Sequence, residues 1–484
     1  MSDTKNTEPR SALDRFFAIT ARGSTVSREV RGGLATFFTM AYIVVLNPLI
    51  IATGKDVDGE YIGDGSTPNI ALVAAGTAFV AGVMTILMGV VGKVPFAMAA
   101  GLGLNAFVTF NIATVMSWEE AMGLVFLEGV IIAILVLTGL RTAVFHAIPA
   151  QLKTAISVGI GLFIALIGFV DAGFVRKAQG TPLELGIAGN LTSWPIFVFI
   201  VGLLATAALV ARKVKGAILI GIVGTTILAI VVEVFTKAGN FSAENPGGWQ
   251  LNRPTVPEQI FGFHNPLTLF TEFDPIGGFQ RVTILLAVLF VFTLLITDFF
   301  DTMGTVVGVG RQAGLVQEDG MLPRTKQILL VDSIGAAAGG AGSVSSNTTY
   351  IESAAGVGEG ARTGLASVVT GALFLVAIFF APLVTVVPNE AAAPALVVVG
   401  FLMMTAIRDI DWNDYELAIP AFLTIVIMPF TYSVSNGIGA GFISYVLIKV
   451  VRGKGREVHP LLWGTAVLFV LYFAIGPIRA LLGV

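Results

Sequence analysis

The chain has 484 residues, of which 55% are hydrophobic and only 12% are charged, and its mean hydropathy is +0.87. A soluble globular protein carries roughly 25% charged residues, so this composition excludes a soluble protein of this size. The formal net charge of −3 favours no class of partner, and the sequence contains no cysteine, which excludes disulfides, thiolate metal sites and cysteine nucleophiles.

Apolar runs recur from residue 30 to the end of the sequence. A membrane-spanning helix needs about 20 apolar residues, and backbone groups in lipid must be satisfied within the segment, so the runs predict an all-α polytopic membrane protein. We expect fourteen spans: 30–52, 70–92, 97–115, 118–140, 152–170, 194–211, 216–236, 283–308, 326–342, 345–360, 364–387, 391–407, 415–431 and 434–451. A further hydrophobic segment at 461–482 either crosses the membrane or lies against it.

The polar tail 1–28 carries five basic residues and no cleavable signal pattern, so the positive-inside rule predicts that it is cytoplasmic. Alternation from there places the acidic loop 54–69 outside and the basic loops inside. The basic loop residues are Arg141, Lys153, Arg212, Lys213, Lys215, Arg311, Arg324, Lys326, Arg452, Lys454 and Arg456. This pattern predicts a multi-pass protein of the cell membrane with a cytoplasmic N-terminus.

The longest polar break, 237–280, divides the expected spans into seven and seven. Because seven is odd, two such halves in series have opposite orientations, which is the plan of an inverted repeat in many transporters. The predicted organisation is a cytoplasmic tail (1–28), a first repeat (29–236), an extracellular connecting loop (237–280), a second repeat (281–452) and a hydrophobic extension (453–484).

Two of the expected spans are interrupted by small or polar residues. The third contains Gly101–Asn105, and the tenth contains residues 343–352, which include Asn347 and end at Glu352. A corresponding pair of broken hydrophobic segments indicates a binding site near the midplane of a transporter. The alternative is that the small residues only allow close helix packing.

Acidic residues within these spans are the strongest functional signal, because ionisable groups in a membrane are costly and usually functional. Asp298 and Asp301 are three residues apart and share a helix face. Glu352 would start a half-helix, near its positive end. Since no basic residue is expected deep in the spans nearby, these carboxylates must bind a cation, take up a proton or accept hydrogen bonds from a ligand.

Three other acids have simpler interpretations. Glu128 fits a buried hydrogen bond at least as well as a role in transport, and Asp332 fits a cap or a packing contact. Glu359 and Arg362 are three residues apart and predict a local ion pair.

No enzyme machinery is evident in the sequence. There is no nucleotide-binding G-x-x-x-x-G-K-[ST] loop and no H-E-x-x-H motif. Gly101-x-Gly103-x-x-Ala106 matches a dinucleotide fingerprint only on paper, because that motif requires a soluble βαβ unit. We therefore predict no enzyme, no cofactor, no metal and no nucleic-acid partner.

Four sequence blocks occur in order: 33–42 with Asn47 and Pro48, 101–107, 298–305, and 349–364. Together they resemble the nucleobase–ascorbate transporters (the second nucleobase–cation symporter family), and within that family the AzgA-like branch of adenine, guanine and hypoxanthine permeases. The resemblance covers nearly the whole chain after residue 28. It implies import of purine nucleobases by proton symport, with protons as the coupling ion.

The resemblance also implies an architecture. Fourteen spans in two inverted repeats would form a core domain (29–140 and 281–387) and a gate domain (141–236 and 388–452). Spans 3 and 10 would begin as short strands that meet at the substrate. The family is generally dimeric, and its core is thought to move as an elevator.

By the same resemblance, the expected substrate-binding residues are Asp298, Glu352, Asn105, Gly103, Tyr350 and Ile351, and the expected proton-coupling residues are Asp298, Asp301 and Glu352. The chemistry suits a purine, because carboxylates accept from ring N–H groups and an asparagine both donates and accepts.

Other functions remain open. Residues 347–350 resemble the matching stretch of uracil and xanthine relatives, and Ala100 stands where the branch often has proline, so a pyrimidine, xanthine or urate permease is an alternative. An anion transporter of the same fold is disfavoured by the three acids. A channel or solute receptor is the alternative from another class.

Overall fold

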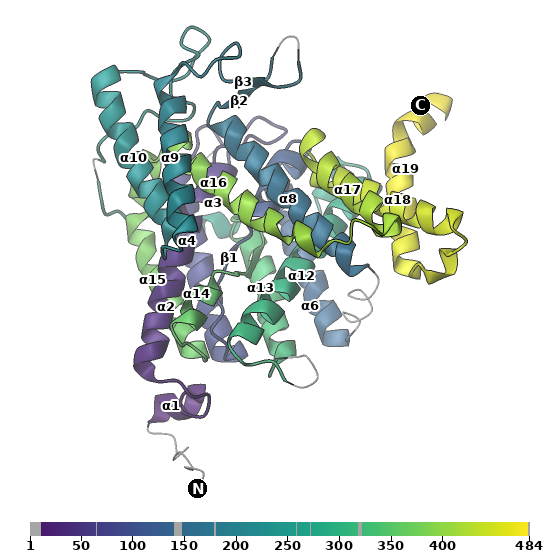
Figure 1. Cartoon of the computed structure of the whole chain (residues 1–484), viewed down its shortest axis with the longest axis horizontal. Coiled ribbons are helices and arrows are strands. Elements are labelled where there is room, and N and C mark those ends of the chain that lie inside the picture. The colour runs from purple at the N-terminus through teal and green to yellow at the C-terminus, as the bar shows by residue number, and fades with distance from the viewer. Residues whose placement is uncertain are drawn as a thin grey trace.

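A computed structural model describes residues 11–63, 65–139, 148–178, 181–257, 259–271, 273–317 and 322–482. Within these ranges the chain is mostly helical, and its few strands are very short (Figure 1). Ordered side chains cap several of the helices. Thr25, Asn69, Ser193 and Thr283 each accept a backbone N–H of the first helical turn, and Ser117 forms a capping box with Glu120.

The elements before the long connecting loop are α1 (Ala12–Phe17), α2 (Val26–Met40), α3 (Ile43–Ile51), α4 (Ile70–Leu87), the turn Met88–Gly92, β1 (Met98–Ala100), α5 (Leu102–Phe107), the turn Val108–Ile112, α6 (Trp118–Thr138), α8 (Ala150–Asp171), β2 (Val175–Arg176), β3 (Glu184–Leu185), α9 (Trp194–Ala211) and α10 (Ala217–Thr236). The connecting loop contains the short helices Pro266–Thr271 and α11 (Gly278–Arg281).

The elements after it are α12 (Ile284–Gln312), α13 (Thr325–Ala341), β4 (Asn347–Thr349), α14 (Ser353–Gly358), α15 (Gly364–Ala377), the 3-10 helix Ile378–Val386, α16 (Asn389–Met404), the 3-10 helix Thr405–Asp409, α17 (Tyr415–Phe430), α18 (Val434–Val451), the 3-10 helix Gly455–Glu457 and α19 (Pro460–Leu482).

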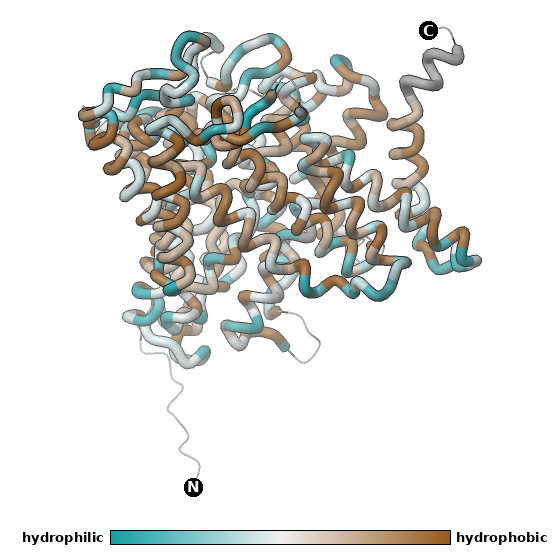
Figure 2. The backbone as a smooth tube through the Cα atoms, turned by 45° about the horizontal axis from the view of Figure 1, so that its top comes forward, coloured by the Kyte–Doolittle hydropathy of each residue, from teal (hydrophilic) through white to brown (hydrophobic). Residues whose placement is uncertain are grey.

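Ten helices among the described residues are long and apolar enough to cross a membrane. Apolar residues predominate along the helices, and hydrophilic residues gather in the loops at their ends (Figure 2). The chain is therefore a multi-pass membrane protein, as the composition predicts. Fourteen spans remain a prediction, because the expected spans 97–115, 326–342, 345–360 and 415–431 form shorter helices.

The helices pack in two groups. The first contains α2, α4, α6 and α12–α15, in which α13 lies along α6, and α15 lies along α4 and α2. The second contains α8–α10 and α16–α18, in which α16 lies along α8 and α9, and α17 lies between α8 and α18. The groups meet where α3 contacts α16, α10 contacts α2, and α5 and α12 contact α8. Helix α19 packs on α18 and α12.

Glycines allow the closest helix contacts in the first group. A Cβ atom at Gly340 of α13 would lie 2.4 Å from the backbone nitrogen of Phe126 and 2.8 Å from the carbonyl oxygen of Met122, both on α6. Membrane helices commonly use small residues in this way, because lipid provides no hydrophobic force between helices and close packing replaces it. This contact fixes α13 relative to α6 beside the central strands.

Candidate functional site

Two broken segments meet inside the first helix group. Strands β1 and β4 pair antiparallel, with Met98 opposite Thr349, Ala99 opposite Thr348 and Ala100 opposite Asn347. Backbone bonds from Gly101 to Ser346 (3.0 Å) and from Tyr350 to Ala97 (2.9 Å) extend the ladder. The short strands expected at the start of spans 3 and 10 are thus present, and each is followed by a short helix, α5 or α14.

Glu352 lies at the start of α14, directly beyond β4, and is half-buried. The hydroxyl of Tyr42, in the link between α2 and α3, donates to its Oε1 across 2.5 Å. Tyr42 is itself only 1% exposed. A fixed carboxylate at a break in a span is the arrangement expected of a ligand acceptor, and Tyr42 is the orienting residue that the sequence analysis did not single out.

The two residues before Glu352 point in different directions. The Tyr350 hydroxyl donates to the carbonyl of Ala100 at 2.5 Å, which ties the end of β4 to the end of β1. The neighbouring Ile351 is 55% exposed. Tyr350 therefore holds the strand crossing together, and Ile351 is accessible next to Glu352.

The two aspartates of α12 have opposite surroundings. Asp298 is fully buried, and its carboxylate oxygens have no hydrogen-bond donor among the described residues. Asp301 is exposed, and its charged neighbours are Asp332 and Glu352. The structure therefore places Asp301 on the accessible side with Glu352, and Asp298 inside the helix group beside Thr348 of β4.

Asp332 of α13 fastens β4 to its surroundings. Its carboxylate accepts from the Thr302 hydroxyl (2.7 Å), the Thr349 hydroxyl (2.9 Å) and the Thr349 backbone N–H (3.1 Å). The Thr302 hydroxyl also lies 2.7 Å from that of Thr348. Asp332 lies inside α13, so of the two interpretations, a cap or a packing contact, the structure shows a contact between elements, made through these hydrogen bonds.

Asn105 and Gly103 lie on α5. Asn105 is fully buried and donates to Asn47 Oδ1 at 2.6 Å, and Asn47 in turn donates to Thr77 Oγ1 (2.8 Å) and to the Val344 carbonyl (3.1 Å). The structure therefore places Asn105 in a network that joins α3, α4 and α5. A Cβ atom at Gly103 would lie 2.5 Å from a side-chain carbon of Ile160, so this glycine lets α5 approach α8.

The predicted ion pair between Glu359 and Arg362 is wrong. Glu359 instead forms an ion pair with Lys215, at the loop between α9 and α10, and a longer one with Arg31 at 3.9 Å. Arg362 donates to the carbonyls of Val357 and Ala361. Glu359 thus joins the two helix groups, a contact between distant segments that helical spacing does not reveal.

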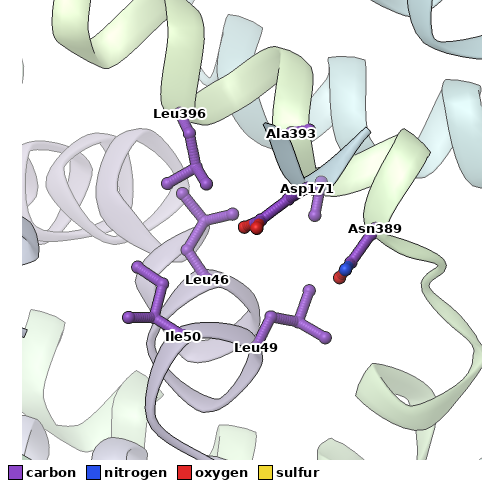
Figure 3. A pocket seen from close by; sticks show the side chains of 8 residues that line it. Leu46, Leu49, Ile50, Asp171, Asn389, Ala393 and Leu396 are labelled. Carbon is purple, nitrogen blue, oxygen red and sulfur yellow. The ribbon is translucent and has the colours of Figure 1, made fainter. Parts of the chain in front are cut away.

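A second polar position lies where the groups meet. A small cavity is lined by Asp171 at the end of α8, Asn389 and Leu396 of α16, and Leu46 and Leu49 of α3 (Figure 3). Asp171 and Asn389 face the apolar side chains of α3 across this cavity. Sequence analysis did not single out either residue, because each lies at the end of its span, where a polar residue is common.

A bundle of membrane helices with two broken segments crossing at an acidic centre defines a membrane transporter. Comparisons give its family. A model of the permease family matches residues 27–439. The guanine/hypoxanthine permease PbuG of Bacillus subtilis is 37% identical over 468 residues, which cover 95% of this chain and 99% of that protein. The adenine permease AdeP of Escherichia coli is 36% identical over 471 residues, 97% of each chain.

The chain belongs to this permease family, the nucleobase–ascorbate transporters, which confirms the resemblance seen in its sequence motifs. Among solved structures, the transmembrane domain of a cyanobacterium bicarbonate transporter, BicA, matches with a TM-score of 0.58 at 17% identity, covering 86% of this chain and 96% of that chain. At that identity the match shows the shared fold alone.

Proposed function

We propose that this protein imports purine nucleobases, namely guanine, hypoxanthine and adenine, by proton symport. The observation that carries the proposal is the Glu352 carboxylate, fixed by Tyr42 at the strand crossing, with Asp301 exposed nearby. Purine rings present N–H donors that carboxylates accept. Two relatives that cover nearly the whole chain, PbuG and AdeP, are named as guanine/hypoxanthine and adenine permeases, which supports the same substrate class here.

The remaining site residues have different roles in this proposal. Glu352 accepts from the purine, Ile351 contacts it, and Tyr350 and Gly103 shape the site through the strand crossing and the approach of α5 to α8. Asn105 positions α5 through Asn47. Asp298 carries the proton, and Asp301 supports Glu352. A site of this kind rejects analogues without the matching N–H, because its buried acceptors would be left unpaired.

The transport cycle is proposed to be of the elevator type. The first helix group corresponds to the core domain and the second, with α8–α10 and α16–α18, to the gate domain. The element order of the two halves supports an inverted repeat, since β1 with α5 in the first half corresponds to β4 with α14 in the second. We further propose a cytoplasmic N-terminus in the cell membrane and a homodimer.

Two alternatives keep specific support. Residues 347–350 favour a uracil, xanthine or urate substrate, and the fold is shared with a bicarbonate transporter. The acids at the site disfavour an anion, because Glu352 and Asp301 would repel it.

A competition panel separates these functions. Vesicles containing the purified protein are given labelled guanine, and uptake is measured with excess unlabelled hypoxanthine, adenine, xanthine, uracil or sulfate. We expect inhibition by hypoxanthine and adenine, and none by sulfate. Vesicles that take up labelled uracil or xanthine but no labelled guanine would move the protein to another substrate class.

A further inference from the structure

A pair of buried acids lies next to the strand crossing and is not explained by substrate binding. Glu128 of α6 and Asp298 of α12 are neighbours, and both side chains are 0% exposed. None of their four carboxylate oxygens receives a hydrogen bond of normal geometry among the described residues, although the hydroxyls of Ser346 and Thr348 lie next to them. Two buried carboxylates in contact cannot both be ionised at acceptable cost, because each charge loses its hydration and repels the other.

The surroundings offer no counter-charge but do offer polar contacts. The charged neighbours of the pair, within the ranges that the structure describes, are Asp332 on α13 and Asp301 one turn along α12, both acids. Asp332 is already engaged by Thr302 and Thr349. The charge of the pair must therefore be relieved by a bound cation.

Polar atoms of β4 and of Ser346, the residue before it, complete the cluster. The hydroxyl of Ser346 and the side-chain amide of Asn347, both at most 1% exposed, also lack partners among the described residues. Ser346 neighbours Glu128, and Thr348 neighbours Asp298. The acid pair therefore lies next to β4, the strand that leads to Glu352. A change in the charge of the pair would alter the electrostatic environment of β4 beside the substrate site.

We propose that Glu128 and Asp298 together hold the transported proton, as one O–H···O⁻ hydrogen bond between their carboxyl groups. This inference rests on the proposed proton symport and identifies its carrier as a pair of acids. A proton from the outer solution forms the O–H bond on one carboxylate oxygen. The same bond breaks when the proton leaves to the cytoplasm, and no other group is consumed.

The test uses Glu128→Gln in vesicles of the full-length protein with labelled guanine. The amide places a permanent N–H donor against Asp298, which fixes the pair in a state equivalent to the protonated one. We expect accumulation driven by an inward pH gradient to fall at least tenfold, whereas exchange of internal for external guanine stays within about twofold of wild type. The matched control is Glu390→Gln on α16, an equally buried acid with one unpaired oxygen, which should accumulate guanine as wild type does.

A second variant, Glu128→Asp, keeps a titratable carboxyl and is expected to restore pH-driven accumulation. Full accumulation by Glu128→Gln would overturn the proposal, and so would a Glu128→Gln protein that loses both exchange and accumulation. A Glu128→Asp protein that exchanges guanine but does not accumulate it would also overturn the proposal. Accumulation by wild type that requires a sodium gradient and no proton gradient would also overturn the proposal. If wild-type vesicles take up no guanine at all, the proposed function fails, which is distinct from failure of the acid pair alone.

Discussion

The side chain that donates to Glu352 within the described residues is the neutral hydroxyl of Tyr42, so the charge and the orientation of Glu352 can be changed separately. Glu352→Gln keeps the shape of the side chain and removes the charged acceptor. Hydrogen bonds to charged groups are worth roughly 1.5–3 kcal/mol, so guanine should bind at least about tenfold more weakly. Binding is measured by titration of purified protein, with the amount in the membrane as a control. Normal binding by this variant would show that Glu352 does not contact the substrate.

Tyr42→Phe tests the orientation of the same carboxylate. The phenyl ring fills the same volume but donates nothing to Glu352 Oε1. A single hydrogen bond contributes about 1 kcal/mol net, so we expect affinity to fall about fivefold, less than in Glu352→Gln. The same titration checks this order. A Tyr42→Phe protein that binds guanine more weakly than Glu352→Gln would show that Tyr42 contacts the ligand itself.

Ile351 provides a direct probe of where the substrate lies. The sequence contains no cysteine, so Ile351→Cys introduces the only thiol, at a position that is 55% exposed next to Glu352. We expect a soluble maleimide to label this thiol and guanine to slow the labelling. Leu183→Cys, in the loop between β2 and β3 and 49% exposed, is the control whose labelling guanine should not change. Equal labelling of Ile351→Cys with and without guanine would place the substrate elsewhere.

Among the elements, the contact of α13 with α6 leaves no room for an added methyl group at Gly340. A Cβ atom at Gly340 meets backbone atoms of α6, which cannot rotate away, so Gly340→Ala forces the helices apart. Overpacking typically costs about 1–3 kcal/mol. We expect a lower thermal unfolding temperature in detergent.

Gly224→Ala on α10 is the matched control, because nothing lies within 4 Å of the added atom and alanine is the better helix former. Its unfolding temperature should be unchanged or raised. Equal unfolding temperatures for the two variants would show that α13 and α6 are not in close contact at Gly340.

Local sequence predicts the elements of this fold well and their contacts poorly. Apolar runs of about 20 residues predict the long helices, and the glycine and serine interruptions at 101–105 and 343–352 predict the broken segments. The pairing of β1 with β4 came from the resemblance to a family, since three-residue strands leave no pattern of their own. The mistaken Glu359–Arg362 pair shows the limit, because helical spacing could not identify Lys215, 144 residues away, as the partner (359 − 215).

The same limit applies to the site. Glu352, Asp298 and Asp301 were predicted because carboxylates are rare in apolar spans. Tyr42 was not, because a tyrosine in a membrane helix is common and its bond to Glu352 joins residues 310 positions apart. Glu128 and Asp298 are both evident in the sequence as acids within spans. That they are neighbours follows from the packing of α6 against α12, which the sequence does not predict.

At the scale of the whole molecule, one of the contacts between the two helix groups is an exposed ion pair. Lys215, between α9 and α10 of the second group, pairs with Glu359 at the end of α14 in the first group, and the Lys215 side chain is 61% exposed. Exposed ion pairs contribute only about 0–1 kcal/mol. A weak connection of this kind is compatible with the proposed elevator cycle, in which the first group would slide against the second.

Transport against a gradient needs a source of energy. A near-neutral purine gains nothing directly from the membrane potential, and the sequence has no nucleotide-binding loop, so accumulation requires a co-transported cation. The most direct measurement follows labelled guanine in reconstituted vesicles without ATP, in one set without sodium and in one set with an inward sodium gradient. We predict that an inward proton gradient drives accumulation above the external concentration and that a protonophore abolishes it. Accumulation that survives collapse of the pH gradient and membrane potential, but requires a sodium gradient, would contradict the account.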